Sequence, residues 1–173
     1  KIKLINKNYY LVVSRLEPYK KVDLVVQSFN RLKSNLIIVG EGTEKNKLEQ
    51  MTGNNITFLS KLSDVELGNL YSNAQALIMP QEEDLGYVSI EAQFFGCPII
   101  AYIKGGASET VVNGKTGIFF SNQNEKSLRK AIERFDKIKY NLRKELMKFR
   151  GKNLEGFDVK KFKVKFNNFC INL

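Results

Sequence analysis

Short apolar runs alternate with amphipathic stretches along most of this 173-residue sequence. The apolar runs occupy residues 9–13, 36–39, 56–59, 76–79, 98–101 and 117–120. Between the first two runs, apolar residues recur with a helical period at Val22, Val25, Val26, Phe29 and Leu32. Strands that are apolar throughout and alternate with helices are typical of a parallel sheet buried on both faces. The pattern therefore predicts a three-layer α/β domain of about six parallel strands with helices on both faces.

Local signals mark where several of the predicted helices begin and end. Residues 63–66, Ser-Asp-Val-Glu, fit a capping box, in which the Ser63 and Glu66 side chains bind the free amides of a helix start. This helix is expected to bury Leu67, Leu70, Tyr71 and Ala74. Further helices are predicted around residues 48–51, over residues 89–95, around residues 128–135 and over residues 158–169.

The length and the flanks of the sequence bear on domain organisation and location. A chain of 173 residues has the size of one domain, so residues 1–173 are expected to form a single domain. No stretch approaches the ~20 apolar residues that span a bilayer, and residues 1–8 lack the apolar run of a secretory signal. The sequence does not begin with Met, and we expect it to be part of a longer, cytoplasmic protein.

The composition limits the chemistry available within these residues. There is no histidine, which excludes a histidine general base, a Ser-His-Asp triad and a histidine-ligated metal within the chain. The two cysteines, Cys97 and Cys170, are too far apart in sequence for a metal-ligand spacing. We interpret both as free thiols in a reducing compartment, and we expect no metal site.

The net charge of +10 is concentrated near the end of the sequence. Residues 1–125 hold 13 Lys or Arg and 13 Asp or Glu, whereas residues 126–173 hold 15 and 5. Such a basic region suits solvated helix faces or peripheral contact with an anionic membrane surface. Nucleic acid is the least favoured partner, because no aromatic-interleaved basic strand or recognition-helix pattern accompanies the charge.

Charged residues follow the first predicted strand. The loop Ser14-Arg15-Leu16-Glu17-Pro18-Tyr19-Lys20-Lys21 places cations at the carboxyl end of the strand and before a helix. Ligands bind at this edge of parallel sheets, and helix N-termini favour anions there. Arginine can bind two phosphate oxygens in a fork, and lysine supplies a point charge. The loop is thus a candidate diphosphate site, with an ordinary charged surface loop as the alternative.

Glycines follow the second strand in Gly40-Glu41-Gly42. A glycine pair allows backbone to approach a ligand closely. The third glycine and the downstream acid of a dinucleotide fingerprint are missing at the required spacing. A simple tight turn explains the pair equally well.

The segment after the fourth strand, residues 80–92, carries the most informative pattern. Its acids are followed by Gly86, which begins a helix that also holds Glu91. Glu83 and Glu91 are eight positions apart, so both can face one crevice, where carboxylates accept hydrogen bonds from sugar hydroxyls. The amides of Gly86, Tyr87 and Val88 could receive a phosphate. The alternative is a helix start enriched in acids, but this leaves Glu91 without a partner in an apolar helix.

In order and spacing, these segments resemble the C-terminal domain of glycosyltransferase family four, whose members have the GT-B fold of two Rossmann-like domains. The matching segments are Ser14-Arg15-Leu16-x-Pro18-x-Lys20, Ile37-Ile38-Val39-Gly40-Glu41-Gly42, Ile56-x-Phe58-Leu59, Leu70-Tyr71-x-x-Ala74, Glu83-x-x-Gly86-x-x-x-x-Glu91-Ala92, Gly96-x-Pro98 and Thr116-Gly117. Residues 105–110 and 117–120 further resemble a branch with GDP-mannose-dependent mannosyltransferases of surface-polysaccharide and lipopolysaccharide assembly.

The resemblance implies a retaining hexosyltransferase that transfers mannose from GDP-mannose to a glycan or lipid-linked saccharide without a metal. It implies that Arg15 and Lys20 bind the diphosphate and stabilise its charge, while Glu83 binds the donor sugar. The residues implied to bind the nucleotide are Gly42, Lys61, Gly86, Tyr87, Val88 and Glu91, with Glu91 at the ribose. A UDP-sugar donor and a non-catalytic nucleotide-binding module remain alternatives.

The resemblance also bears on the end of the sequence. Residues 157–173 resemble the helix that crosses back to an N-terminal domain, which would bring the acceptor. We therefore expect this chain to be half of an enzyme, able to bind GDP or UDP weakly and unable to transfer sugar alone.

Overall fold

Six parallel strands form one sheet in the order β3-β2-β1-β4-β5-β6. The computed structural model describes residues 8–154. The strands are β1 (Tyr9–Val13), β2 (Asn35–Val39), β3 (Ile56–Leu59), β4 (Leu77–Met79), β5 (Ile99–Tyr102) and β6 (Gly117–Phe120). The predicted three-layer α/β fold, Rossmann-like and with about six parallel strands, is confirmed.

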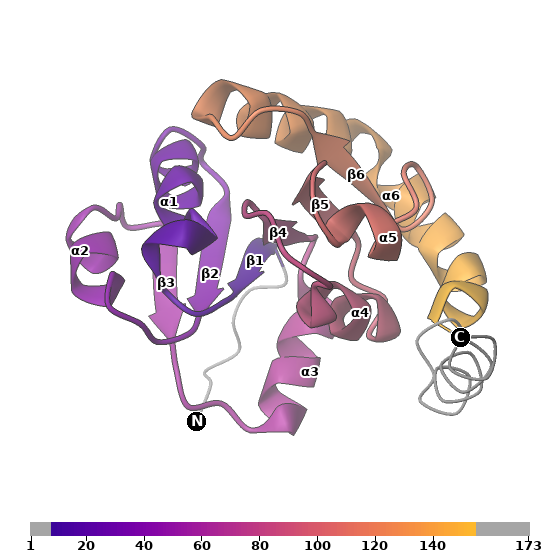
Figure 1. Ribbon diagram of the computed structural model, residues 1–173, viewed down its shortest axis with the longest axis horizontal. Coiled ribbons are helices and arrows are strands. Elements are labelled where there is room, and N and C mark those ends of the chain that lie inside the picture. Colours follow the sequence, from indigo (N-terminus) through magenta and orange to yellow (C-terminus); the bar gives the residue numbers. More distant parts are fainter. Residues whose placement is uncertain (1–7, 155–173) are drawn as a thin grey trace, which may run out of the picture.

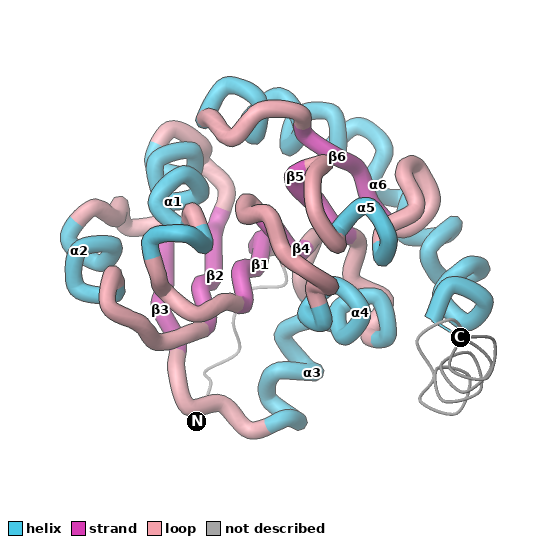
Figure 2. Tube along the Cα trace, in the orientation of Figure 1, coloured by secondary structure: helices cyan, strands magenta, loops and turns pink. Residues whose placement is uncertain are grey.

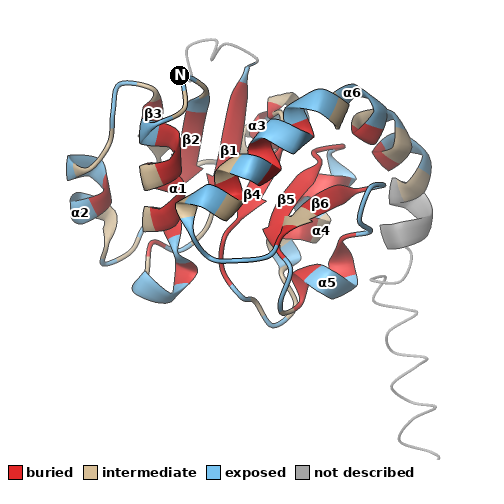
Figure 3. Ribbon diagram, turned by 90° about the horizontal axis from the view of Figure 1, so that it is seen from above, coloured by how far each residue is buried: buried red, intermediate tan, exposed pale blue. Residues whose placement is uncertain are grey.

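The helices cover both faces of this sheet (Figure 1). They are α1 (Val22–Asn30), α2 (Lys45–Gln50), α3 (Asp64–Asn73), α4 (Tyr87–Phe94), α5 (Ala107–Thr110) and α6 (Glu125–Leu154), with a 3-10 turn η1 (Pro18–Lys20). One buried cluster joins the sheet to α1, α2 and α6, and a second joins the opposite face to α3, α4 and α5. Figure 3 shows buried strands between the layers and the exposed side of α6 turned outward. Burial on both faces explains why the strands are apolar throughout.

Two predicted helix boundaries differ from the structure, by two residues at the start of α4 and by much more at the end of α6. The apolar period placed the first of these helices from residue 89, but α4 begins at Tyr87. The expectation that Gly86 opens the helix is confirmed, because Gly86 takes a left-handed conformation with φ 72° and turns the chain directly into α4. The helix predicted around residues 128–135 continues as α6 from Glu125 to Leu154. The short elements η1 and α5 were not predicted. The helix expected over residues 158–169 lies outside the described residues.

The capping box at the start of α3 is present as predicted. The Glu66 amide donates to the Ser63 hydroxyl, and the Ser63 amide donates to the Glu66 carboxylate. Of the four residues expected to be buried by this helix, Leu67 is only half-buried. The box begins the helix that leads from β3 back to β4, so it helps to set the path of the chain across the sheet.

The order of the strands reverses beside β1, since the chain builds β1, β2 and β3 in one direction and then returns to place β4 on the other side of β1. At such a switch point the loops after the two central strands diverge and leave a crevice at the carboxyl edge. Here the two loops are residues 14–21 after β1 and residues 80–86 after β4 (Figure 2). Both loops carry residues that the sequence singled out.

Candidate functional site

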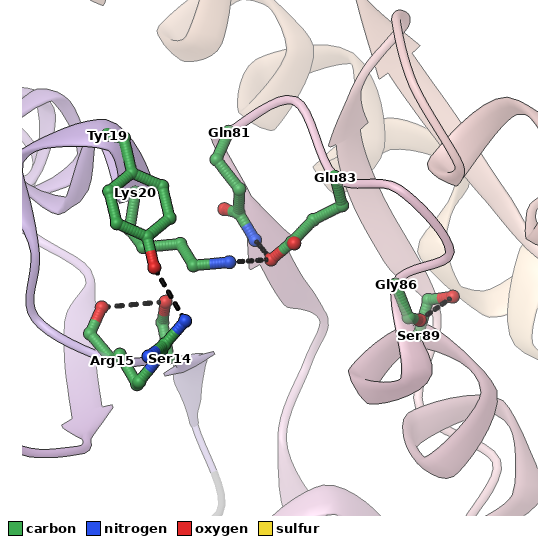
Figure 4. Close-up of polar contacts among 8 residues, drawn as sticks. All are labelled: Ser14, Arg15, Tyr19, Lys20, Gln81, Glu83, Gly86 and Ser89. Atoms are coloured by element: carbon green, nitrogen blue, oxygen red, sulfur yellow. Dashed lines mark hydrogen bonds and ion pairs between the residues drawn. The ribbon is translucent and has the colours of Figure 1, made fainter.

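Lys20, Glu83 and Gln81 meet across the switch point (Figure 4). The Lys20 Nζ lies 2.5 Å from Glu83 Oε1, and the Gln81 Nε2 donates to the same oxygen at 2.6 Å. The Lys20 and Glu83 side chains are 11% and 22% exposed. The structure thus brings together two of the three residues predicted to be catalytic, and adds Gln81, which the sequence analysis did not select.

The backbone around η1 directs Lys20 toward Glu83. Pro18 occupies the first position of η1, where its fixed φ suits a helical turn. Lys20 ends the turn, and Lys21 takes a left-handed conformation with φ 54° that leads the chain into α1. A left-handed residue other than glycine costs roughly 1–2 kcal/mol. This local strain at Lys21 lies next to the buried cation of the site.

Arg15 lies on the same loop but is exposed, and within residues 8–154 it forms no hydrogen bond or ion pair with Glu83. Its guanidinium donates to the Tyr19 hydroxyl at 2.7 Å. The Lys20 Nζ lies 5.0 Å from the centre of the Tyr19 ring, within range of a cation–π contact. Tyr19 therefore touches both predicted phosphate-binding cations from one position, a role that the sequence analysis missed.

The acidic loop after β4 rests on the glycines after β5. The Gly106 amide donates to the Glu83 carbonyl at 2.5 Å. A Cβ at Gly105 would lie 2.5 Å from that carbonyl oxygen, and a Cβ at Gly106 would lie 2.3 Å from the carbonyl oxygen of Asp84. Both positions therefore require glycine. Residues 105–106 were noted in the sequence only through the resemblance. In the structure they support the backbone of the Glu83 loop and fix its distance from the residues after β5.

The start of α4 lies at the same edge. No side chain caps this helix, and by helix geometry its first amides, including those of Tyr87 and Val88, have no intrahelical acceptor. The Ser89 hydroxyl donates to the Gly86 carbonyl at 2.8 Å and holds the turn (Figure 4). Free amides at a helix N-terminus can bind an anion. The predicted role of Gly86, Tyr87 and Val88 in binding the nucleotide stays a prediction.

Glu91 departs from the expectation based on the sequence. It is exposed, and the Tyr71 hydroxyl donates to its Oε2 at 3.1 Å. The argument that Glu91 lacks a partner in an apolar helix was therefore wrong, because α3 places Tyr71 against α4. Burial, followed by the Glu91 charge and hydrogen bond, raises the pKa of Tyr71 far above its ordinary value. The predicted contact of Glu91 with a ribose stays a prediction.

Gly42 and Lys61 belong to the neighbouring loops after β2 and β3. A Cβ at Gly42 would lie 2.4 Å from the Leu16 carbonyl oxygen, and the Leu16 amide donates to the Glu41 carbonyl at 2.8 Å. Close packing of two backbones thus explains this glycine without a ligand. Lys61 is exposed and left-handed, with φ 54°. A hydrogen bond from Ser60, then one from Lys45, lowers the pKa of the exposed Glu41 carboxyl, with a small contribution from Lys61.

A cavity of about 600 Å³ lies between α1 and α6, and none of the residues predicted to bind a ligand lines it. In the part of the chain that the structure describes, no three His, Cys, Asp or Glu side chains are grouped as a metal site would require. Within residues 8–154, no helix combines the length and apolarity of a membrane span.

Comparison with protein-family models finds one match. The family described as "Glycosyl transferases group 1" matches residues 2–151. Among curated relatives, the Staphylococcus aureus capsular polysaccharide biosynthesis glycosyltransferase CapM is 30% identical over 145 residues, which cover 76% of this chain and 38% of the relative. A Mycobacterium tuberculosis glycogen synthase is 34% identical over 119 residues, which cover 62% of this chain and 29% of the relative.

Solved structures share the fold at lower identity. Anabaena HepE in complex with UDP has a TM-score of 0.81 and 21% identity, covering 95% of this chain and 49% of that one. Staphylococcus aureus TarM, as a G117R mutant with fondaparinux, α-GlcNAc-glycerol and UDP, has a TM-score of 0.82 and 19% identity, covering 96% and 37%. This chain thus spans half or less of the length of these proteins.

Proposed function

This chain belongs to the group 1 glycosyl transferases, and we propose that it is the sugar-nucleotide-binding half of a retaining glycosyltransferase. The enzyme would transfer a hexose from a nucleoside diphosphate to a glycan or lipid-linked saccharide. The main support is the contact between Lys20 and Glu83 across the switch point, with 2.5 Å between Nζ and Oε1. The shorter span of this chain supports a second domain that holds the acceptor and completes the reaction.

The chemistry of the crevice suits a sugar diphosphate. Lys20 offers a positive charge to the diphosphate, with Arg15 on the same loop and the free amides at the start of α4. When the bond between the sugar carbon and the phosphate oxygen breaks, its electrons pass to the diphosphate. Positive groups preorganised around that oxygen stabilise the developing charge. No metal is needed for this role, and Glu83 remains to accept hydrogen bonds from sugar hydroxyls.

In the ligand-free chain, Lys20 and Glu83 neutralise each other. A sugar diphosphate would offer each of them a new partner of matching chemistry, phosphate for the ammonium and hydroxyl for the carboxylate. Neither group then stays buried without a partner, which would cost several kcal/mol. Before the ligand binds, the ion pair thus keeps both side chains close to the positions in which they would contact it.

The base of the sugar nucleotide has two candidates. GDP-mannose is proposed from the resemblance carried by residues 105–110 and 117–120. In the structure, however, Gly105 and Gly106 pack on the acidic loop, and a Cβ at Gly117 would lie 2.4 Å from the Ile99 carbonyl oxygen. These packing reasons are independent of the base. A UDP-hexose is the second candidate, because HepE and TarM are described as complexes with UDP.

The acceptor and the location follow from less direct support. CapM is described as a capsular polysaccharide biosynthesis enzyme, so we propose a growing surface polysaccharide, such as a capsule or lipopolysaccharide, as the acceptor. Its lipid carrier would place the enzyme at the cytoplasmic face of a membrane. The basic excess of residues 126–173 supports peripheral contact with anionic lipid there.

Calorimetric titration of the chain with GDP, UDP, GDP-mannose and UDP-glucose tests the proposal. We expect one base to bind, and Lys20→Met to weaken binding of that nucleoside diphosphate roughly tenfold or more, because a charge-assisted contact to phosphate is lost. Lys139→Met is the matched control. It removes the same charge from a lysine that contacts Gln75 and Asp136 away from the crevice, and should leave the affinity unchanged.

Two results would contradict the proposal: no binding of any of the four compounds, or equal losses in the two lysine variants. A non-catalytic nucleotide-binding module is separated by the full-length protein. There, Glu83→Ala should abolish sugar transfer, whereas a pure binding module would keep its biological role.

A further inference from the structure

Gln81 is an unusual residue to find buried at the start of the acidic loop. Its side chain is inside the protein, with 4% of the residue exposed. The Nε2 donates to Glu83 Oε1, but the Oε1 of Gln81 itself is buried without a hydrogen-bond partner among the described residues. A buried carbonyl oxygen left unpaired destabilises a fold, and such groups call for a functional explanation.

The two groups that bind Glu83 meet the same oxygen. Lys20 approaches Oε1 from the loop after β1, and Gln81 approaches it from the loop after β4 (Figure 4). Within residues 8–154, no hydrogen bond or ion pair involves the other oxygen, Oε2. A carboxylate held through one oxygen presents the second in a defined direction, as an acceptor for a ligand hydroxyl.

We infer that Gln81 is a positioning residue for the donor sugar, an inference that rests on the function proposed above. The ammonium of Lys20 is attracted to the diphosphate when the sugar nucleotide binds, so its hold on Glu83 weakens. The neutral amide of Gln81 has no such competing attraction. It keeps the Glu83 carboxylate in place, with Oε2 toward the sugar, and thereby preserves the preorganised site.

Other contacts already anchor this loop, so its fold does not depend on Gln81. The Gly106 amide binds the Glu83 carbonyl, and the Gln123 Nε2 donates to the Pro80 carbonyl at 2.9 Å. Gln81→Met keeps the size of the side chain and removes the unpaired oxygen together with the hydrogen bond. We therefore expect this variant to melt within a few degrees of the unaltered chain.

The decisive measurement compares the affinity for the nucleoside diphosphate with that for its hexose conjugate, by calorimetry on the same chain. The ratio of the two dissociation constants reports the contribution of the sugar. Gln81→Met should lower that contribution roughly five- to tenfold, the effect of one hydrogen bond to a charged group, and leave diphosphate binding unchanged. Gln81→Glu, similar in size but without the donor at neutral pH and repelled by Glu83, should lose at least as much.

Gln75→Met is the matched control, because it removes a glutamine whose side-chain amide binds Asn8, away from the acidic loop and Glu83. It should keep the full contribution of the sugar. The inference is overturned if Gln81→Met keeps that contribution, or if it weakens the diphosphate and the conjugate equally. Failure of the unaltered chain to bind any conjugate would instead overturn the proposed function, and this role with it.

A ligand-free measurement tests the contact itself. The side-chain amide of Gln81 can be assigned in a nitrogen–proton correlation spectrum by its absence in Gln81→Met. We expect this signal to shift in Glu83→Gln and that of Gln123 to stay in place. A Gln81 signal that ignores the loss of the Glu83 carboxylate would overturn the positioning role, whether or not the chain binds nucleotides.

Discussion

The two edges of the sheet each organise a long basic side chain, but they give it opposite kinds of partner. At the carboxyl edge, Lys20 pairs with the carboxylate of Glu83. At the amino edge, the guanidinium of Arg143 donates to backbone carbonyls, that of Ala74 at 2.9 Å and that of Gly96 at 3.3 Å. The first contact joins two side chains, whereas the second joins a side chain to the backbone of helix ends.

The carbonyls that Arg143 binds lie just past the ends of α3 and α4, and the Ser72 carbonyl lies 3.5 Å away. Helix C-termini leave carbonyls unpaired and carry partial negative charge, so a cation there is favourable. The Arg143 side chain of α6 thus caps the C-terminal ends of α3 and α4, which lie on the other face of the sheet. The comparison shows one cation that binds backbone carbonyls at helix ends and another that binds a carboxylate, which under the proposed function would be exchanged for a ligand.

The amino edge also buries neutral groups that resist ionisation. The Tyr9 hydroxyl donates to the Leu70 carbonyl, and Cys97 is fully buried. Burial raises the pKa of the Cys97 thiol to about 12, although the Arg143 charge acts in the opposite direction. Burial likewise raises the pKa of Tyr9 to about 12. The free thiol predicted for Cys97 is therefore present and unreactive at neutral pH, while Cys170 lies outside the described residues.

The sharpest way to separate the edges is Arg143→Met. It removes the charged donor of several helix-end carbonyls, and we expect the free energy of unfolding to fall by about 3 kcal/mol, because hydrogen bonds to charged groups contribute roughly 1.5–3 kcal/mol each. Urea denaturation measures the loss. Lys144→Met removes the same charge from an exposed position of α6 and should cost little. A nucleotide affinity that falls in the folded Arg143 variant would break the separation.

Gly106→Ala tests how far stability and binding are joined at the carboxyl edge. The backbone of Gly106 is ordinary for alanine, with φ −59°, so only the clash with the acidic loop matters. We expect a loss of about 2 kcal/mol from overpacking, together with weaker binding of the sugar nucleotide, by thermal melting and calorimetry.

Gly114→Ala supplies the contrast, because this glycine has φ 76° but open space around it. It should cost about 1 kcal/mol through backbone strain alone and leave binding unchanged. Unaltered affinity in Gly106→Ala would show that the Glu83 loop does not depend on its glycine support.

The smallest expected effect is on the pH dependence of stability, and it comes from the buried Cys97 thiol. The pKa of Cys97 is raised by folding, so the folded state binds the proton more tightly than the unfolded chain. Stability from this group is fully present below pH 9, the ordinary value, and is lost as the pH rises toward 12. Urea denaturation between pH 8 and 11 should therefore show a shallower decline for Cys97→Ala than for the unaltered chain. The contribution of Tyr9 to stability falls with rising pH in both proteins, so it cancels in the comparison. Equal declines of stability in the two proteins would refute the burial argument for Cys97.

Much of the fold could be predicted because its signals are local. The apolar runs predicted all six strands within one residue of their observed starts and ends, and the capping box predicted the start of α3. The apolar period alone placed the start of α4 two residues too late, whereas the glycine at position 86 marked it correctly. The period of side chains cannot report a left-handed turn one residue before a helix.

The candidate site could be predicted in part. Lys20 and Glu83 were selected because strands, charges and the resemblance marked them, and the structure brings them into contact. The contacts of Gln81 with Glu83 and of Tyr71 with Glu91 were missed. A neutral amide or a tyrosine in a sequence does not indicate which residue, 2 or 20 positions away, it will bind. For Gln81, its position between a strand end and the acidic cluster was the one available signal.

The sequence by itself determined the alternation of strands and helices, the edge at which charges gather, and the chemical types available there. Those depend on periodicity and on which residues follow each strand. Only the tertiary structure decided which charges meet, because the strand order that places β4 beside β1 joins loops 63 residues apart. It also decided that Lys20 contacts a carboxylate, whereas Arg143 contacts backbone carbonyls. Pairing in space depends on how layers stack, and that information is spread over the whole core.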